Sequence, residues 1–188
     1  MDQDGAGTEL SDDDVFVVLR PKSPGRFVFA SPHSGTVYPQ EMGADPALAE
    51  ASLRSAEDAL VDRLIAPGVD LGATVVLGRL GRAWIDLNRD PADLDPVLIE
   101  GAADGSVSAR TTAGYGVIPR LAGDGRPLYD RRLTLDEARD RIARTHAPYH
   151  QALADGMEAA RARYGEAVLV DWHSMPARCR IRLSSSAR

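Results

Sequence analysis

Short apolar runs bounded by proline and glycine alternate along this chain with longer stretches of helical spacing. The apolar runs are rich in valine, leucine, isoleucine and aromatic residues, a composition typical of β-strands. They are continuous rather than alternating, which is expected where a sheet is covered on both faces. These runs predict strands over residues 15–19, 27–30, 73–77, 83–87 and 166–171.

Helical signals lie between these runs. Thr134-Leu-Asp-Glu137 has the pattern of a capping box, in which two side chains satisfy the first free N–H groups of a helix. It opens a helical pattern that ends near Arg163, with Gly165 placed to terminate it. Pro148 lies inside this pattern and predicts a kink or a split, because proline lacks an N–H group. Two shorter helices are expected, from Asp45-Pro46 and over 56–65 behind Ser55-Ala-Glu-Asp58.

Strands that alternate with helices indicate an α/β domain with a mixed or mostly parallel sheet and helices on both faces. We expect residues 15–176 to form this domain. Residues 1–14 are acidic and contain glycine, so we expect a mobile tail. Residues 177–188 are basic and rich in serine, unlike the rest of the chain, and we expect an aberrant or disordered tail.

Composition narrows the possible partners. The 188 residues carry a net charge of −6 and no basic stripe, so nucleic acid is not an expected partner. The one cysteine, Cys179, permits no internal disulfide and fits a cytoplasmic location. No apolar run has the length that crosses a bilayer, so a soluble protein without a membrane partner is expected. The sequence leaves the oligomeric state open.

Two histidines stand at the carboxyl ends of predicted strands. His33 follows the run at 27–30, His173 follows the run at 166–171, and each is followed directly by serine. The functional crevice of an open α/β sheet lies outside the carboxyl ends of its strands. A lone histidine in this position is more often structural, but two of them favour a shared metal ion. Catalytic zinc sites commonly take three protein ligands, so we expect the third to be a carboxylate.

Asp58 and Glu57 are the nearest carboxylates along the sequence, and either fits. Both also fit ordinary roles at a helix N-terminus, so the choice stays open at this point. The serines that follow the two histidines lack the turn that activates a serine nucleophile. We interpret them, with two nearby aspartates, as groups that orient the ligands. The residues in this supporting set are Ser34, Asp86, Asp171 and Ser174.

Asn88-Arg89 follows a predicted strand and is a candidate substrate clamp. The planar arginine side chain binds a carboxylate through two hydrogen bonds, and asparagine donates to a carbonyl oxygen. The alternative is a turn amide beside a surface ion pair. His146 and His150 have the spacing of two ligands on one helix face, but Pro148 lies between them and no glutamate follows His146. We therefore expect structural or surface roles for both.

Several motifs together resemble the N-formylglutamate amidohydrolase family. They occur in the family's order and cover most of residues 27–176. The resemblance implies a three-layer α/β/α sandwich around a mixed, mostly parallel sheet, as in zinc carboxypeptidases and aspartoacylases. The motifs are Ser31-Pro-His-Ser-Gly35, Arg54-Ser-Ala-Glu-Asp-Ala-Leu-Val-Asp-Arg-Leu64, Ala83-Trp-Ile-Asp-Leu-Asn-Arg-Asp-Pro91, Asp93-Leu-Asp-Pro96, Gly114-Tyr-Gly-Val-Ile-Pro-Arg120, Pro148-Tyr-His150 and Asp171-Trp-His-Ser-Met-Pro176.

The resemblance also implies a reaction: zinc-dependent hydrolysis of N-formyl-L-glutamate, or a similar N-acyl amino acid, to formate and L-glutamate in histidine breakdown. One Zn²⁺ per chain is then held by His33, His173 and a carboxylate from the Glu57–Asp58 pair, with Asp58 the first choice. A small-molecule substrate is bound by Asn88 and Arg89, and Arg120 meets its second carboxylate.

The family pattern continues beyond the motif around His173, and related zinc hydrolases take their general base from that later region. The resemblance therefore implies a chain that is truncated at its C-terminus, and it identifies no catalytic base. The alternative function is a non-catalytic remnant that binds metal or an acidic amino acid.

Overall fold

A four-stranded mixed sheet forms the centre of the computed structural model, which describes residues 15–103 and 107–175. Its strand order is β1-β3-β2-β6. The expected tails at 1–14 and 177–188 lie outside the described residues. β1 (Phe16–Leu19) runs antiparallel to β3 (Thr74–Gly78), whereas β3, β2 (Phe27–Ser31) and β6 (Val168–Asp171) run parallel.

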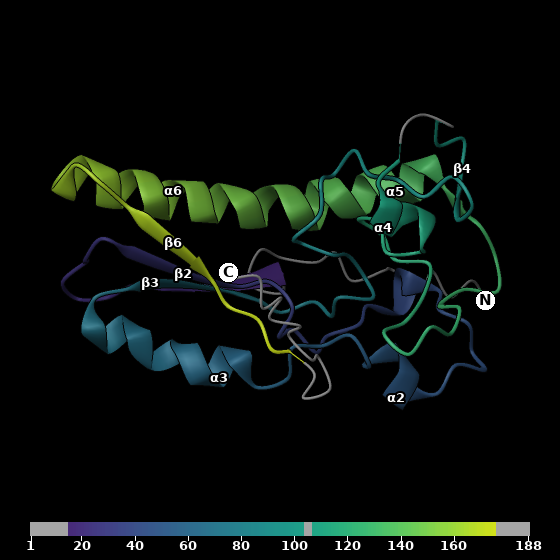
Figure 1. Ribbon diagram of the computed structural model, residues 1–188, viewed down its shortest axis with the longest axis horizontal. Coiled ribbons are helices and arrows are strands. Elements are labelled where there is room, and N and C mark those ends of the chain that lie inside the picture. Colours follow the sequence, from purple (N-terminus) through teal and green to yellow (C-terminus); the bar gives the residue numbers. More distant parts are fainter. Residues whose placement is uncertain (1–14, 104–106, 176–188) are drawn as a thin grey trace, which may run out of the picture.

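Helices cover both faces of this sheet, as Figure 1 shows. The long α6 (Ala147–Tyr164) packs on β2 and β3 from one side, and α3 (Val61–Ile65) packs on β2 from the other. Val75 and Val76 are neighbours in β3, are both fully buried and belong to two different core clusters. Successive strand residues thus fill opposite layers, and the expected α/β/α sandwich with a mostly parallel sheet is confirmed.

The remaining elements are short. η2 continues α3 and packs on β3, whereas most of the others gather beside the sheet. β4 pairs with β5 in a small parallel ladder. The bounds are η1 Gln40–Met42, α2 Glu50–Leu53, η2 Ala66–Leu71, β4 Ile99–Glu100, α4 Ala109–Thr112, β5 Leu133–Thr134 and α5 Leu135–Arg141.

The predicted long helix is present as α5, a π-helical turn over Ile142–His146, and α6. The capping box at Thr134 and Glu137 forms with both hydrogen bonds, and Gly165 ends α6 with φ 76°. The π-turn ends two residues before Pro148, whose missing N–H group breaks the regular bonding pattern. The expected interruption is therefore real. No helix within 15–103 and 107–175 is both long and apolar enough to cross a membrane.

The strand predicted over 83–87 is wrong. The segment is a series of turns, although Trp84, Ile85 and Leu87 are almost completely buried. Its backbone bonds are local or isolated, from Trp84 N–H to the Gly81 carbonyl and from Asp86 N–H to the Val117 carbonyl. A short apolar run indicates burial, but it does not distinguish a strand from another buried backbone.

The first short helix was predicted wrongly, and the second is present only over Val61–Ile65, as α3. Asp45 accepts a hydrogen bond from the Ala47 N–H group in a turn, and the nearest helix, α2, begins only at Glu50. The capping box expected at Ser55 does not form, because Leu60 adopts φ 67° and α3 begins after it. The chain also continues beyond Pro67 as the 3-10 helix η2.

Candidate metal centre

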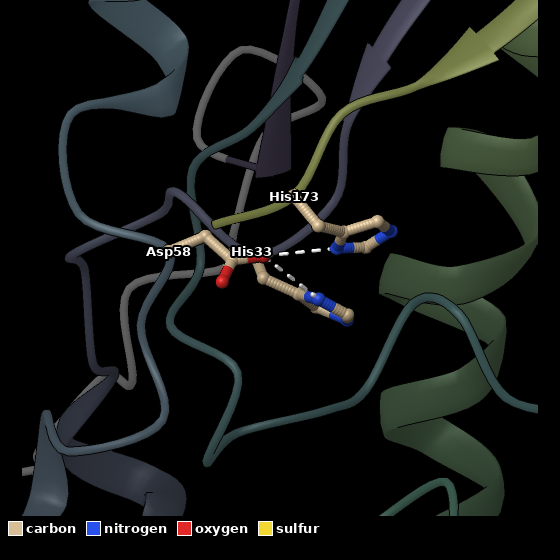
Figure 2. A group of neighbouring side chains, drawn as sticks. All are labelled: His33, Asp58 and His173. Carbon is tan, nitrogen blue, oxygen red and sulfur yellow. Dashed lines mark hydrogen bonds and ion pairs between the residues drawn. The ribbon is translucent and has the colours of Figure 1, made fainter. Parts of the chain in front are cut away.

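His33, Asp58 and His173 converge at one edge of the sheet (Figure 2). His33 follows β2 and His173 follows β6, and these strands are parallel neighbours, so their carboxyl ends meet. Asp58 lies in the turn before α3, where its backbone N–H group donates to the His33 carbonyl at 2.9 Å. One donor atom from each residue lies within 4.8 Å of the other two.

The two imidazoles present their Nδ1 atoms to the same carboxylate oxygen. Asp58 Oδ2 lies 2.9 Å from His173 Nδ1 and 3.5 Å from His33 Nδ1. His33 is buried, and its Nδ1 has no hydrogen-bond partner within the described ranges. An unpaired buried polar atom is costly. Two imidazole nitrogens and one carboxylate are a ligand set that suits zinc, so the residues fit a metal ion.

The opposite nitrogen of each ring is held by a second carboxylate. His33 Nε2–H donates to Asp86 Oδ1 at 2.7 Å, and His173 Nε2–H donates to Asp171 Oδ2 at 3.0 Å. In a neutral ring, a proton on Nε2 leaves the lone pair on Nδ1 free to bind a metal ion at the centre. Histidine ligands of metals are commonly oriented in this way.

The structure decides between the two candidate carboxylates. Glu57 turns away from the histidines, accepts a hydrogen bond from the Tyr38 hydroxyl at 2.8 Å and pairs with Arg54 at 3.1 Å. Only Asp58 of this pair reaches the cluster. The Ser174 hydroxyl donates to Asp58 Oδ1 at 2.8 Å and so orients the carboxylate rather than an imidazole.

Of the four supporting candidates, Ser34 alone has a side chain that makes no hydrogen bond to His33, Asp58 or His173 within the described residues. Its hydroxyl accepts a hydrogen bond from the Ser31 hydroxyl at 2.7 Å, and both serines are buried. This contact ties the turn after β2 to the end of the strand itself. Ser34 therefore shapes the backbone next to His33.

Polar contacts keep the Asp58 carboxylate ionised. Burial raises the pKa of Asp58, but its contacts with His33, His173 and Ser174 outweigh burial and hold this pKa below its usual range. Burial lowers the pKa of His173, but Asp171 and Asp58 outweigh it and raise this pKa above its usual value. Ionised carboxylates are the form that binds a metal, whereas protons compete with a metal for the imidazoles.

Asn88 and Arg89 lie beside this cluster. The Asn88 side-chain amide donates to Asp171 Oδ2 at 2.9 Å and lies 3.2 Å from His173 Nε2. Arg89 Nε donates to the Tyr115 carbonyl at 3.2 Å, and the guanidinium lies 3.6 Å from Asp86 Oδ2. Asn88 therefore borders His173 directly, and Arg89 lies beside Asp86, which contacts His33.

The backbone of this turn is fixed by the other two histidines. His146 Nε2–H donates to the Arg89 carbonyl at 2.9 Å, and His150 Nε2–H donates to the Leu87 carbonyl at 2.8 Å. The two rings lie 4.2 Å apart between their centroids. A structural role was expected for His146 and His150, but the sequence did not indicate that they hold the turn around Asn88.

A cavity of about 260 Å³ adjoins the cluster, with Asp86 and Arg89 in its wall. Arg82, Arg110 and Tyr115 also line it. Tyr115 belongs to the motif at 114–120, whereas Arg82 and Arg110 lie outside the motifs and were not singled out from the sequence. Arg120, the expected partner of a second carboxylate, does not line this cavity.

The side chain of Arg120 is already engaged. Its Nε donates to the buried carboxylate of Asp95 at 2.9 Å. Asp95 in turn accepts from the Val97 N–H group at 2.8 Å. Arg120 and Asp95 thus form an ion pair that ties together two loops beside the cavity.

Two imidazoles and a carboxylate at the strand ends of a mixed α/β sandwich form a site suited to a metal ion. The model of the family described as N-formylglutamate amidohydrolase matches residues 25–186. The chain therefore belongs to the N-formylglutamate amidohydrolase family.

Relatives support this assignment. The chain is 29% identical over 165 residues to the N-formylglutamate deformylase of Pseudomonas aeruginosa, covering 87% of this chain and 56% of that protein. It is 32% identical over 108 residues to the deformylase of Pseudomonas putida, covering 56% of this chain and 36% of that protein. It thus spans at most slightly more than half the length of these relatives.

Solved structures agree. A crystal structure of N-formylglutamate amidohydrolase from Ralstonia eutropha JMP134 superposes with a TM-score of 0.79 at 36% identity, over 87% of this chain and 59% of that one. A gene product of Agrobacterium tumefaciens, Atu2144, has a TM-score of 0.61 at 20% identity, over 89% of this chain and 59% of that one, and shares the fold.

Proposed function

We propose that this chain is a zinc-dependent hydrolase that cleaves N-formyl-L-glutamate, or a similar N-acyl amino acid, to formate and L-glutamate. The observation that carries the proposal is the convergence of His33, Asp58 and His173 around an unpaired, buried Nδ1 atom. The names of the relatives support the substrate, since they are N-formylglutamate deformylases and an N-formylglutamate amidohydrolase. With this reaction we propose one Zn²⁺ per chain, a role in histidine breakdown and a cytoplasmic location.

In this proposal the three side chains of the cluster hold the zinc ion. Zinc supplies a Lewis acid that polarises the formyl carbonyl and makes water more acidic. Asp86 and Asp171 keep the ring protons on Nε2, and Ser174 fixes the rotation of the Asp58 carboxylate. These contacts preorganise the cluster, so little reorganisation is needed when substrate arrives.

Asn88 and Arg89 orient the substrate. The guanidinium of Arg89 binds the α-carboxylate, and the Asn88 amide donates to an oxygen beside the scissile bond. His146 in the π-helical turn and His150 in α6 hold the backbone carbonyls on both sides of Asn88. Such positioning is a large part of catalysis, because small displacements of a substrate are costly in rate. We do not assign the role of general base to any residue that the structure describes.

Formate release from N-formyl-L-glutamate by the zinc-loaded chain tests the proposal. We expect release by the wild type and its loss in His33→Ala and His173→Ala. The matched control is Arg139→Gln on the solvent side of α5, which is expected to keep full activity. A panel of N-formyl and N-acetyl amino acids identifies the acyl group. Folded, zinc-loaded protein without turnover of any of these compounds would contradict the enzyme assignment.

A further inference from the structure

The cavity beside the cluster is strongly positive for a protein with a net charge of −6. Three arginines line it, Arg82, Arg89 and Arg110, against a single acidic residue, Asp86. Its volume of about 260 Å³ lies just below the range of small-molecule pockets, roughly 300–1,000 Å³, so it suits a small ligand. A small ligand with more than one negative charge is complementary to this wall.

The three arginines are not equally available. Arg82 Nε and Nη2 donate to Asp86 Oδ2 at 3.1 and 2.9 Å, so its charge is matched inside the protein. Arg89 reaches the same oxygen only at 3.6 Å. For Arg110, no carboxylate lies within ion-pair distance among residues 15–103 and 107–175. Arg89 and Arg110 therefore supply the unmatched positive charge.

The backbone that carries Arg110 is well anchored. Arg110 lies in α4, where the Ser108 side chain accepts from the Thr111 N–H group at 3.1 Å. The Ser108 hydroxyl also donates to Asp93 Oδ2 at 2.6 Å, and the Tyr115 N–H group donates to the Arg110 carbonyl at 2.8 Å. The backbone of Arg110 is thus held in a fixed turn at the cavity wall.

We propose that Arg110 is a specificity-determining residue that binds the side-chain carboxylate of an acidic amino acid while Arg89 binds its α-carboxylate. This inference rests on the proposed function and names the residue that selects its substrate class. It transfers to Arg110 the role that the family resemblance implied for Arg120, whose guanidinium is paired with Asp95 outside the cavity. Asp86, paired with Arg82 and His33, forms the wall between this subsite and the metal centre.

Calorimetric titration of zinc-loaded protein with L-glutamate and L-glutamine tests the assignment, because the two ligands differ only in the side-chain carboxylate. The wild type is expected to bind L-glutamate about 10–100-fold more tightly, as a charge-assisted hydrogen bond implies. Arg110→Gln should lose this preference and keep its affinity for L-glutamine. Arg110→Lys should restore part of the preference, because it keeps the charge but not the planar fork.

Arg139→Gln and Arg120→Gln are the controls and should keep the preference. The inference is overturned if Arg110→Gln still prefers L-glutamate, if Arg120→Gln alone abolishes the preference, or if the wild type binds L-glutamate no more tightly than L-glutamine. Thermal melting verifies that each variant is folded. The titration needs no turnover, so failure of formate release with the preference intact would reject the proposed reaction and leave the subsite standing.

Discussion

The four histidines of this chain form two pairs of similar appearance and different chemistry. The rings of His33 and His173 lie 5.0 Å apart, and those of His146 and His150 lie 4.2 Å apart. The first pair comes from the ends of two strands far apart in the sequence, whereas the second comes from consecutive turns of one helical segment. Proximity of two rings therefore does not by itself distinguish a metal site from a structural contact.

The partners of the rings make the distinction. The first pair donates from Nε2 to carboxylates, which increase the basicity of the ring and leave Nδ1 directed at Asp58. The second pair donates from Nε2 to backbone carbonyls, which fix a turn and offer no third donor atom. A carboxylate facing each of the two ring nitrogens is thus the feature that favours His33 and His173 as metal ligands.

The largest contrast is expected in zinc affinity. His33→Ala, Asp58→Ala and His173→Ala each remove a ligand and should weaken zinc binding by more than about 100-fold. Glu57→Gln, next to Asp58 but turned away from the cluster, is the matched control and should bind zinc as the wild type does. Competition with a chromophoric chelator measures the affinity. Full zinc occupancy in the alanine variants at His33 and His173 would show that the ligand assignment is wrong.

A smaller effect is expected when a carboxylate behind a ring is neutralised. Asp171→Asn keeps the shape of the side chain but weakens the hydrogen bond to His173, so zinc affinity should fall by about 10–100-fold. Asp155→Asn, on the exposed face of α6, is the control for a lost negative charge. The same chelator competition compares the two variants. Equal affinities for them would place Asp171 outside the metal site.

The second pair should affect stability instead. His150→Ala leaves the Leu87 carbonyl unpaired and should lower the free energy of unfolding by about 1–3 kcal/mol, without changing zinc affinity by more than about twofold. Urea unfolding of metal-free protein measures the loss. Gln151→Ala, at the next, exposed position of α6, should change stability by less than about 0.5 kcal/mol. If a folded His150→Ala variant lost its zinc, the distinction between a metal-binding pair and a structural pair of histidines would be wrong.

The smallest effect is a pH dependence that originates at His146. Burial lowers the pKa of this histidine, and the neighbouring His150 lowers it further. The Arg89 carbonyl and the charges of Asp86 and Asp90 raise this pKa, but they offset the lowering only in part. The unfolded chain, with a histidine pKa near 6.5, takes up a proton that the folded protein resists, so stability should fall as pH drops through about 6.5.

Proton NMR of the His146 ring tests this sign, and the titration midpoint should lie below about 6.5. The stability of His146→Gln should depend less on pH than that of the wild type, because the group that responds is absent. A midpoint at or above the unfolded value would mean that the Arg89 carbonyl and the neighbouring aspartates dominate over burial.

Much of the fold follows from local patterns, since capping and strand runs depend on residues within a few positions. The capping box at Thr134 and the strands near 27–30 and 73–77 are confirmed for this reason. The segment 83–87 was misassigned because its burial comes from distant contacts. Trp84, for example, lies under the guanidinium of Arg141 at 4.1 Å and donates to the Thr145 hydroxyl.

The sequence alone determined the family, the α/β class and the two strand-end histidines, because each depends on residues near one another in the chain. Only the tertiary structure decided that Asp58 rather than Glu57 meets those histidines, through a contact that spans 115 positions. It also decided that Arg110 rather than Arg120 faces the cavity. Neighbouring side chains of equal charge are equivalent in a sequence, and they differ only in the direction that the folded backbone gives each of them.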